Sequence, residues 1–121
     1  MHVKRVVVVL GLGLLWACGT SDPYGSGATC TPTATQVCSV GGVAFSPVTR
    51  TVASGTTVSW INGDGVTHTV TNDPGSGQTF DLALGSGGTV TQQFNTPGTY
   101  NYHCSFHGSP GAGMHGTITV N

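Results

Sequence analysis

Charge is what this sequence has least of. Among its 121 residues there are three Lys or Arg and four Asp, and charged residues make up only 6% of the chain. Two of the three basic residues, Lys4 and Arg5, lie at the extreme N-terminus, so the rest of the chain has one arginine and four aspartates, a net charge of −3 with histidine neutral. Without a basic patch to neutralise phosphates, nothing indicates a nucleic-acid partner. Solubility must come from Thr, Ser, Asn and Gln, which suits β-structure outside the cytoplasm.

Long apolar runs are also missing beyond residues 6–16. This run is too short to span a bilayer hydrocarbon core, which is about 30 Å thick. Because it directly follows Lys4 and Arg5 at the start of the chain, residues 1–17 predict an export signal peptide. The alternative is a buried strand at residues 6–10.

The end of the apolar run, Leu15-Trp16-Ala17-Cys18, resembles the lipoprotein box of bacterial export signals. The resemblance implies that the signal is cleaved before Cys18 and that this cysteine carries lipid. The protein would then be exported to the periplasm or cell envelope and anchored in a membrane through Cys18. Trp16 departs from the pattern, which usually has a small or β-branched residue there. Residues 18–37, rich in Gly, Ser, Thr and Pro, are predicted to form a flexible tether.

The four cysteines divide into three roles. The lipoprotein-box resemblance assigns Cys18 to lipid, and Cys104 remains for the chemistry described below. In an oxidising compartment Cys30 and Cys38 would form a disulfide, worth about 2.5 kcal/mol of stability if unstrained. The alternative is that both are free or pair elsewhere.

Sustained helical periodicity is absent, and short alternating runs separated by Gly, Pro, Asn and Asp recur from residue 40 onward. About seven to eight short strands within a single domain at residues 38–121 predict an all-β fold, a two-sheet Greek-key sandwich. We expect a monomer. The expected strands lie at residues 43–47, 49–52, 56–62, 66–71, 89–94, 98–104 and 116–120.

The side chains with the most distinctive chemistry gather near the C-terminus. Cys104, His107 and Met114 lie between two alternating runs, on a Gly- and Pro-rich segment that can aim them at one point. A further histidine, His68, lies on an upstream predicted strand. One thiolate, two imidazoles and a weak thioether are the ligand set of an electron-transfer copper site.

The C-terminal pattern Cys104-x2-His107 followed by Met114-x-Gly116-x-Ile118-x-Val120 resembles the cupredoxins, the small blue copper proteins, and most closely their plastocyanin-like branch. The resemblance also rests on the expected strand ending at residues 58–62, followed by His68-Thr69-Val70, and it covers residues 43–121. It implies one type 1 copper ion, with His68, Cys104 and His107 as strong ligands and Met114 as the weak axial ligand. It also implies a one-electron carrier, not an enzyme, that shuttles electrons between redox partner proteins outside the cytoplasm.

Two departures from the family pattern and one competing histidine concern the site. Six residues separate His107 from Met114, where two or four are usual, so we expect a bulge in this loop. His115 is a competing axial ligand, whereas strand alternation turns His103 away from Cys104. Thr69 follows the first histidine in place of the usual Asn, which puts the hydrogen bond from this position to the thiolate sulfur in question, although a backbone donor could replace it.

An apolar patch is expected around the outer edge of His107. In the cupredoxins that the sequence resembles, redox partners dock at such a patch, and the electron enters or leaves the protein there. The alternative is that these side chains only pack the loop. The patch residues are Phe106, Pro110 and Ala112.

Two other functions remain open from the sequence. One is a copper-binding or copper-delivery protein without redox cycling. The other is a zinc-stabilised or metal-free β-sandwich adhesion module. The sequence has no second cluster of His-rich motifs, as a multicopper oxidase or nitrite reductase would need.

Overall fold

The structure, a computed structural model, describes residues 30–41 and 43–121. The predicted signal peptide and Cys18 lie outside the described residues. In the part described, no helix is long and apolar enough to cross a membrane. The strands found there are β1 (Gln36–Val40), β2 (Ala44–Ser46), β3 (Thr49–Val52), β4 (Thr56–Asn62), β5 (His68–Asn72), β6 (Asp81–Leu84), β7 (Thr89–Phe94), β8 (Gly98–Ser109) and β9 (Ala112–Val120).

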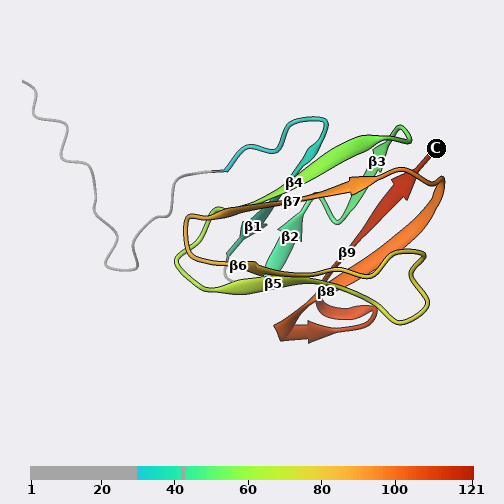
Figure 1. Ribbon diagram of the computed structural model, residues 1–121. Helices are drawn as coiled ribbons and strands as arrows, with labels where there is room; N and C mark the ends of the chain where they lie inside the picture. The colour runs from blue at the N-terminus through green and yellow to red at the C-terminus, as the bar shows by residue number, and fades with distance from the viewer. Residues whose placement is uncertain (1–29, 42) are drawn as a thin grey trace, which may run out of the picture.

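The strands form two sheets that face each other (Figure 1). One sheet has the order β2-β1-β4-β7 and the other the order β3-β9-β8-β5-β6. The pairs β1–β4 and β3–β9 are parallel, and the other pairs are antiparallel. The predicted all-β sandwich is therefore confirmed, with nine strands in the described residues where seven to eight were expected.

The strands missed by the sequence analysis are β1 and β6. Three consecutive residues of β1, at positions 37–39, are buried, so this strand has no alternation to detect. Its start at Gln36 places the last two residues of the predicted tether in the sheet. β6 has only four residues and lies at the edge of its sheet, so its pattern is too short to distinguish from a loop.

A disulfide joins Cys30 to Cys38, with a Cα–Cα distance of 5.8 Å. This is the pairing that the sequence left open. It attaches the segment before β1 to β1 itself, which lies between β2 and β4. In the described part of the chain Cys104 is the free cysteine, and it is buried.

Aromatic rings fill the space between the sheets and tie the two layers together. Tyr102 of β8 lies edge-on to Trp60 of β4, with ring centroids 5.4 Å apart, and 5.0 Å from the ring of Phe45 on β2. Edge-to-face pairs of this kind stabilise by roughly 0.5–1.5 kcal/mol beyond their burial. Because Tyr102 is two residues before Cys104, this packing also holds the strand that carries the thiol.

Candidate metal centre

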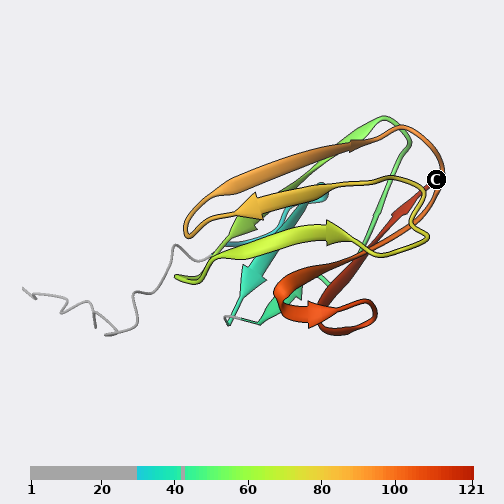
Figure 2. The same ribbon diagram turned by 60° about the horizontal axis from the view of Figure 1, so that its bottom comes forward.

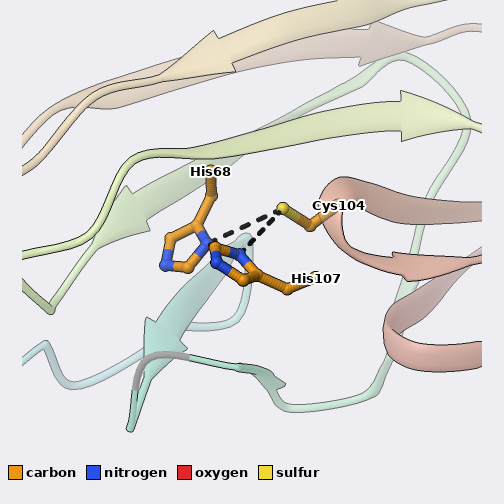
Figure 3. Close-up of side chains that lie close together, drawn as sticks. All are labelled: His68, Cys104 and His107. Atoms are coloured by element: carbon orange, nitrogen blue, oxygen red, sulfur yellow. Dashed lines mark hydrogen bonds between the residues drawn. The ribbon is translucent and has the colours of Figure 1, made fainter.

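The structure brings His68, Cys104 and His107 together at one point (Figure 3). The Cys104 Sγ lies 3.7 Å from Nδ1 of His68 and 3.5 Å from Nδ1 of His107, and the two ring nitrogens are 3.2 Å apart. The point equidistant from the corners of a triangle with these sides is about 2.0 Å from each corner, close to metal–nitrogen and metal–sulfur bond lengths of about 2.0–2.3 Å. The three donor atoms therefore fit around one metal ion.

His68 reaches the site because β5 pairs with β8. The pairs Thr71–His103 and Asn72–Tyr102 bring the start of β5 next to Cys104, although Thr69 and this cysteine are 35 positions apart along the chain. The backbone N–H of Thr69 donates to Cys104 Sγ at 3.4 Å. A backbone group thus supplies the sulfur hydrogen bond that the replacement of Asn by Thr had put in doubt.

The side chain of Thr69 contributes a second link between these strands. Its hydroxyl accepts a hydrogen bond from the backbone N–H of Ser105 at 2.9 Å and lies 2.8 Å from the Ser105 hydroxyl. Because Ser105 is the next residue after Cys104, Thr69 links β5 both to the thiol and to the residue that follows it.

A bulge in β8 turns Cys104 and His107 toward the same point. The register changes between the pairs His103–His115 and Gly108–Gly113. Between these pairs β8 has four residues, 104–107, and β9 has only Met114. The extra residues bend the strand, as bulges do.

Met114 is the single β9 residue opposite this bulge, and its side chain is fully buried in the core. His115 is only partly buried, and its Nδ1 lies 2.9 Å from the carbonyl oxygen of Gly113. His103 faces away from the site, as expected, and its Nδ1 is 2.6 Å from a carboxylate oxygen of Asp73.

The segment expected to be a loop with a bulge is a hairpin that extends beyond the bulge. β8 continues to Ser109 and β9 begins at Ala112, with Gly108 opposite Gly113. Figures 1 and 2 show this hairpin tip curling away from the rest of the sheet. The six residues between His107 and Met114 therefore form a short hairpin end, which sequence spacing alone did not distinguish from a loop.

Sequence reasoning missed Asp64 as a residue of the site. Its two carboxylate oxygens each lie 3.0 Å from Nε2 of the buried His68. Partial burial raises the pKa of the Asp64 carboxyl, but hydrogen bonds from the Val66 N–H and from His68 outweigh this and hold the pKa below its ordinary value. The available signal was an aspartate four residues before a candidate ligand.

The site lies just under the surface. His68 and Cys104 are fully buried, His107 is partly exposed, and the neighbouring Phe106 is 66% exposed. A metal held here would be shielded from water on most sides, with one ligand ring near the surface.

Comparison with known proteins agrees with this geometry. Residues 31–121 match the family described as copper binding proteins of the plastocyanin/azurin family. Plastocyanin from Scenedesmus fuscus is 37% identical over 89 residues, which are 66% of this chain and 89% of that protein. Plastocyanin from Ulva prolifera is 35% identical over 89 residues, with the same coverage of both chains.

Solved structures show the same fold. A purple cupredoxin from Nitrosopumilus maritimus is 31% identical, with a TM-score of 0.57 over 71% of this chain and 98% of that one. A copper-containing nitrite reductase from Thermus scotoductus is 29% identical, with a TM-score of 0.63, but the match covers only 23% of its chain and 76% of this one. The likeness to that enzyme is therefore confined to a fraction of its length.

The donor set and the family match lead to the same cofactor. A thiolate and two imidazoles suit copper, and the His–Cys–His cluster supports a single copper ion in this family. We conclude that the chain belongs to the plastocyanin/azurin family of copper-binding proteins, the cupredoxins.

Proposed function

We propose that this protein is a one-electron carrier whose copper ion is held by His68, Cys104 and His107, with Met114 as the weak axial ligand. The observation that carries the proposal is the triangle of two Nδ1 atoms and one Sγ around a single point. Bound copper supplies a Cu(I)/Cu(II) couple, and thiolate with imidazole are donors acceptable to both states. The protein's part is to hold these donors in one arrangement, through the β5–β8 pairing and the bulge in β8.

The first prediction concerns the copper-loaded protein. We expect an intense visible sulfur-to-copper absorption and reversible one-electron voltammetry at an electrode, because the donors are fixed by strand pairing and need not rearrange between oxidation states. Ultraviolet–visible spectroscopy and protein-film voltammetry of the same sample measure both.

Two outcomes would contradict this function. If the protein is coloured but releases its metal on reduction, the alternative of a copper-delivery protein without redox cycling is favoured. If added Cu(II) produces no visible band, the site does not bind copper through Cys104, and a zinc-stabilised or metal-free sandwich becomes the better hypothesis.

The second prediction separates Met114 from His115 as the axial ligand. Met114 is buried opposite the bulge, whereas His115 contacts the Gly113 carbonyl and is partly exposed. Met114→Leu should shift the reduction potential and the visible spectrum, because the axial ligand tunes both. His115→Asn should leave them nearly unchanged. A larger effect from His115→Asn, measured by voltammetry and absorption, would reverse the assignment.

We propose that redox partner proteins dock over the partly exposed edge of His107. Phe106 is 66% exposed, and its ring centroid is 6.3 Å from that of His107. Pro110 and Ala112 are also exposed, at the neighbouring hairpin tip. These side chains support an apolar docking patch next to His107. Because His107 is the partly exposed ligand, it gives an electron the shortest path to the surface.

Export and anchoring through Cys18 remain part of the proposal. The Cys30–Cys38 disulfide supports an oxidising compartment such as the periplasm or cell envelope, since structural disulfides persist mainly in such settings. The features of residues 1–18 support a cleaved signal and a lipid-anchored N-terminus. Mass spectrometry of membrane-fraction protein would detect lipid on Cys18 or its absence.

A further inference from the structure

The carboxylate of Asp64 contacts the proposed copper ligand His68 on the side of the ring that faces away from the other two proposed ligands. Asp64 places both oxygens 3.0 Å from Nε2 of His68, while the Nδ1 of this histidine faces Cys104 and His107. An ionised carboxylate can only accept a hydrogen bond here, so in the neutral form of His68 the proton lies on Nε2 and Nδ1 has the free lone pair. This is the tautomer that metal binding through Nδ1 requires.

Asp64 is itself held in place by the turn before β5. Its backbone N–H donates to Oδ1 of Asn62 at 3.0 Å, and its own Oδ1 accepts from the Val66 N–H at 2.9 Å. The amide of Asn62 donates to the Val66 carbonyl at 2.7 Å, and Oδ1 of Asn62 accepts from the Ser39 hydroxyl at 2.9 Å. The carboxylate is thus fixed to the buried end of β4.

The same turn packs closely against the disulfide. A Cβ added at Gly63 would lie 2.9 Å from the Cys30 Cβ and 2.9 Å from the Ser39 carbonyl oxygen, so there is no room for a side chain. Because Ser39 follows Cys38 in β1, the disulfide and the turn form one packed unit beneath Asp64. The position of the carboxylate is therefore set by the packing and the hydrogen bonds of the turn itself.

We propose that Asp64 is a positioning residue of the copper site, which orients the His68 ring and stabilises the oxidised metal relative to the reduced one. This inference rests on the proposed function, in which His68 is a ligand. Two physical effects act in the same direction. A hydrogen bond from the outer nitrogen to a carboxylate makes the inner nitrogen a stronger donor. The fixed negative charge favours the oxidised site, because that site has one more positive charge than the reduced one.

The chain contains a matched control for this test. Asp73 contacts Nδ1 of His103 at 2.6 Å, and both side chains are only slightly exposed, as Asp64 is, whereas His68 is fully buried. The His103 ring faces away from the copper point. Asp73→Asn therefore removes one negative charge and alters one Asp–His pair, as Asp64→Asn does, but leaves the proposed ligands untouched.

The experiment compares the copper-loaded wild-type protein with Asp64→Asn and Asp73→Asn. We expect Asp64→Asn to keep the visible band but to weaken Cu(II) binding relative to Cu(I) by about tenfold, at the lower end of the effect of outer hydrogen-bond partners. For a one-electron couple this is a rise of about 59 mV in reduction potential. Asp73→Asn should shift the potential by a much smaller amount. Equal potentials for wild type and Asp64→Asn, or equal shifts in both variants, would overturn the proposal.

A measurement on the wild type covers the case in which Asp64→Asn does not fold. In the Cu(I) protein, which is diamagnetic, nitrogen-15 NMR should find the His68 proton on Nε2 in a hydrogen bond protected from exchange. A proton that exchanges freely with water would overturn the role of Asp64. A wild-type protein without the visible band would instead refute the proposed function, so the two failures are distinguishable.

Discussion

Cys104→Ser is expected to abolish the visible absorption of the copper-loaded protein almost completely. The band arises from charge transfer between sulfur and copper, and Cys104 is the free cysteine of the described chain, with its sulfur facing both ring nitrogens. A serine hydroxyl is a harder and weaker donor, so copper affinity should fall as well. Absorption spectra after stoichiometric Cu(II) addition, with metal content determined in parallel, measure both effects.

The fold should survive this substitution. Serine is close to cysteine in size, and the Thr69 N–H that donates to Cys104 Sγ has an oxygen available in the variant. Circular dichroism and thermal melting of the metal-free variant should therefore resemble those of the metal-free wild type. The control is the double variant Cys30→Ser with Cys38→Ser, which removes the disulfide but should keep the colour. Colour that persists in Cys104→Ser would refute the thiolate ligand.

Gly108→Ala is expected to damage both stability and the copper site. A Cβ at this position would lie 2.6 Å from the carbonyl oxygen and 2.7 Å from the nitrogen of Met114, and 2.9 Å from the Ala112 carbonyl oxygen. All three are backbone atoms of the facing strand, so no side chain can move aside to relieve the contact. The two strands of the hairpin would have to separate, at a cost of about 1–3 kcal/mol in the free energy of unfolding.

This separation should also displace the proposed copper ligands, because Gly108 directly follows His107 and faces the backbone of Met114. We expect a shifted visible spectrum and faster copper loss to a chelator. The matched control is Gly85→Ala, since a Cβ at Gly85 meets nothing within 4 Å and its backbone is not in the left-handed region. Chemical denaturation and chelator kinetics compare the two variants. Similar stability and spectra in both would show that the hairpin tip tolerates a wider strand separation.

How much of the site could be foreseen differs between its residues. His107 is three residues from Cys104, so their proximity is a local property that spacing can indicate. His68 is brought to them by the pairing of β5 with β8, a long-range contact that a local pattern does not encode. It was predicted because the residues around it matched a family pattern. No family pattern included Asp64, and only the tertiary structure places its carboxylate against His68.

The strands show the same division. In β4 one face is buried and the other is at least partly exposed, so the alternation of the sequence indicates the strand directly. Residues 56–62 were predicted as a strand with the observed bounds. β1 lies between two other strands and has three buried residues in succession, and its sequence QVCSV does not alternate between apolar and polar residues. The hairpin end of β8 and β9 is mostly exposed and Gly-rich, and its register depends on the bulge at residues 104–107.

By itself, the sequence determined the type of chemistry and the class of fold. One thiol, two imidazoles and a thioether restrict the suitable metals, and the alternation of short runs restricts the architecture, because both properties belong to residue types and local periodicity. Only the tertiary structure decided which atoms meet. The convergence of Nδ1, Nδ1 and Sγ, the burial of Met114 opposite the bulge and the carboxylate behind His68 all depend on strand register across the sheets. A slip of one residue in register would turn these side chains to the opposite face of the sheet, and the pattern of a single strand does not specify which strand it pairs with.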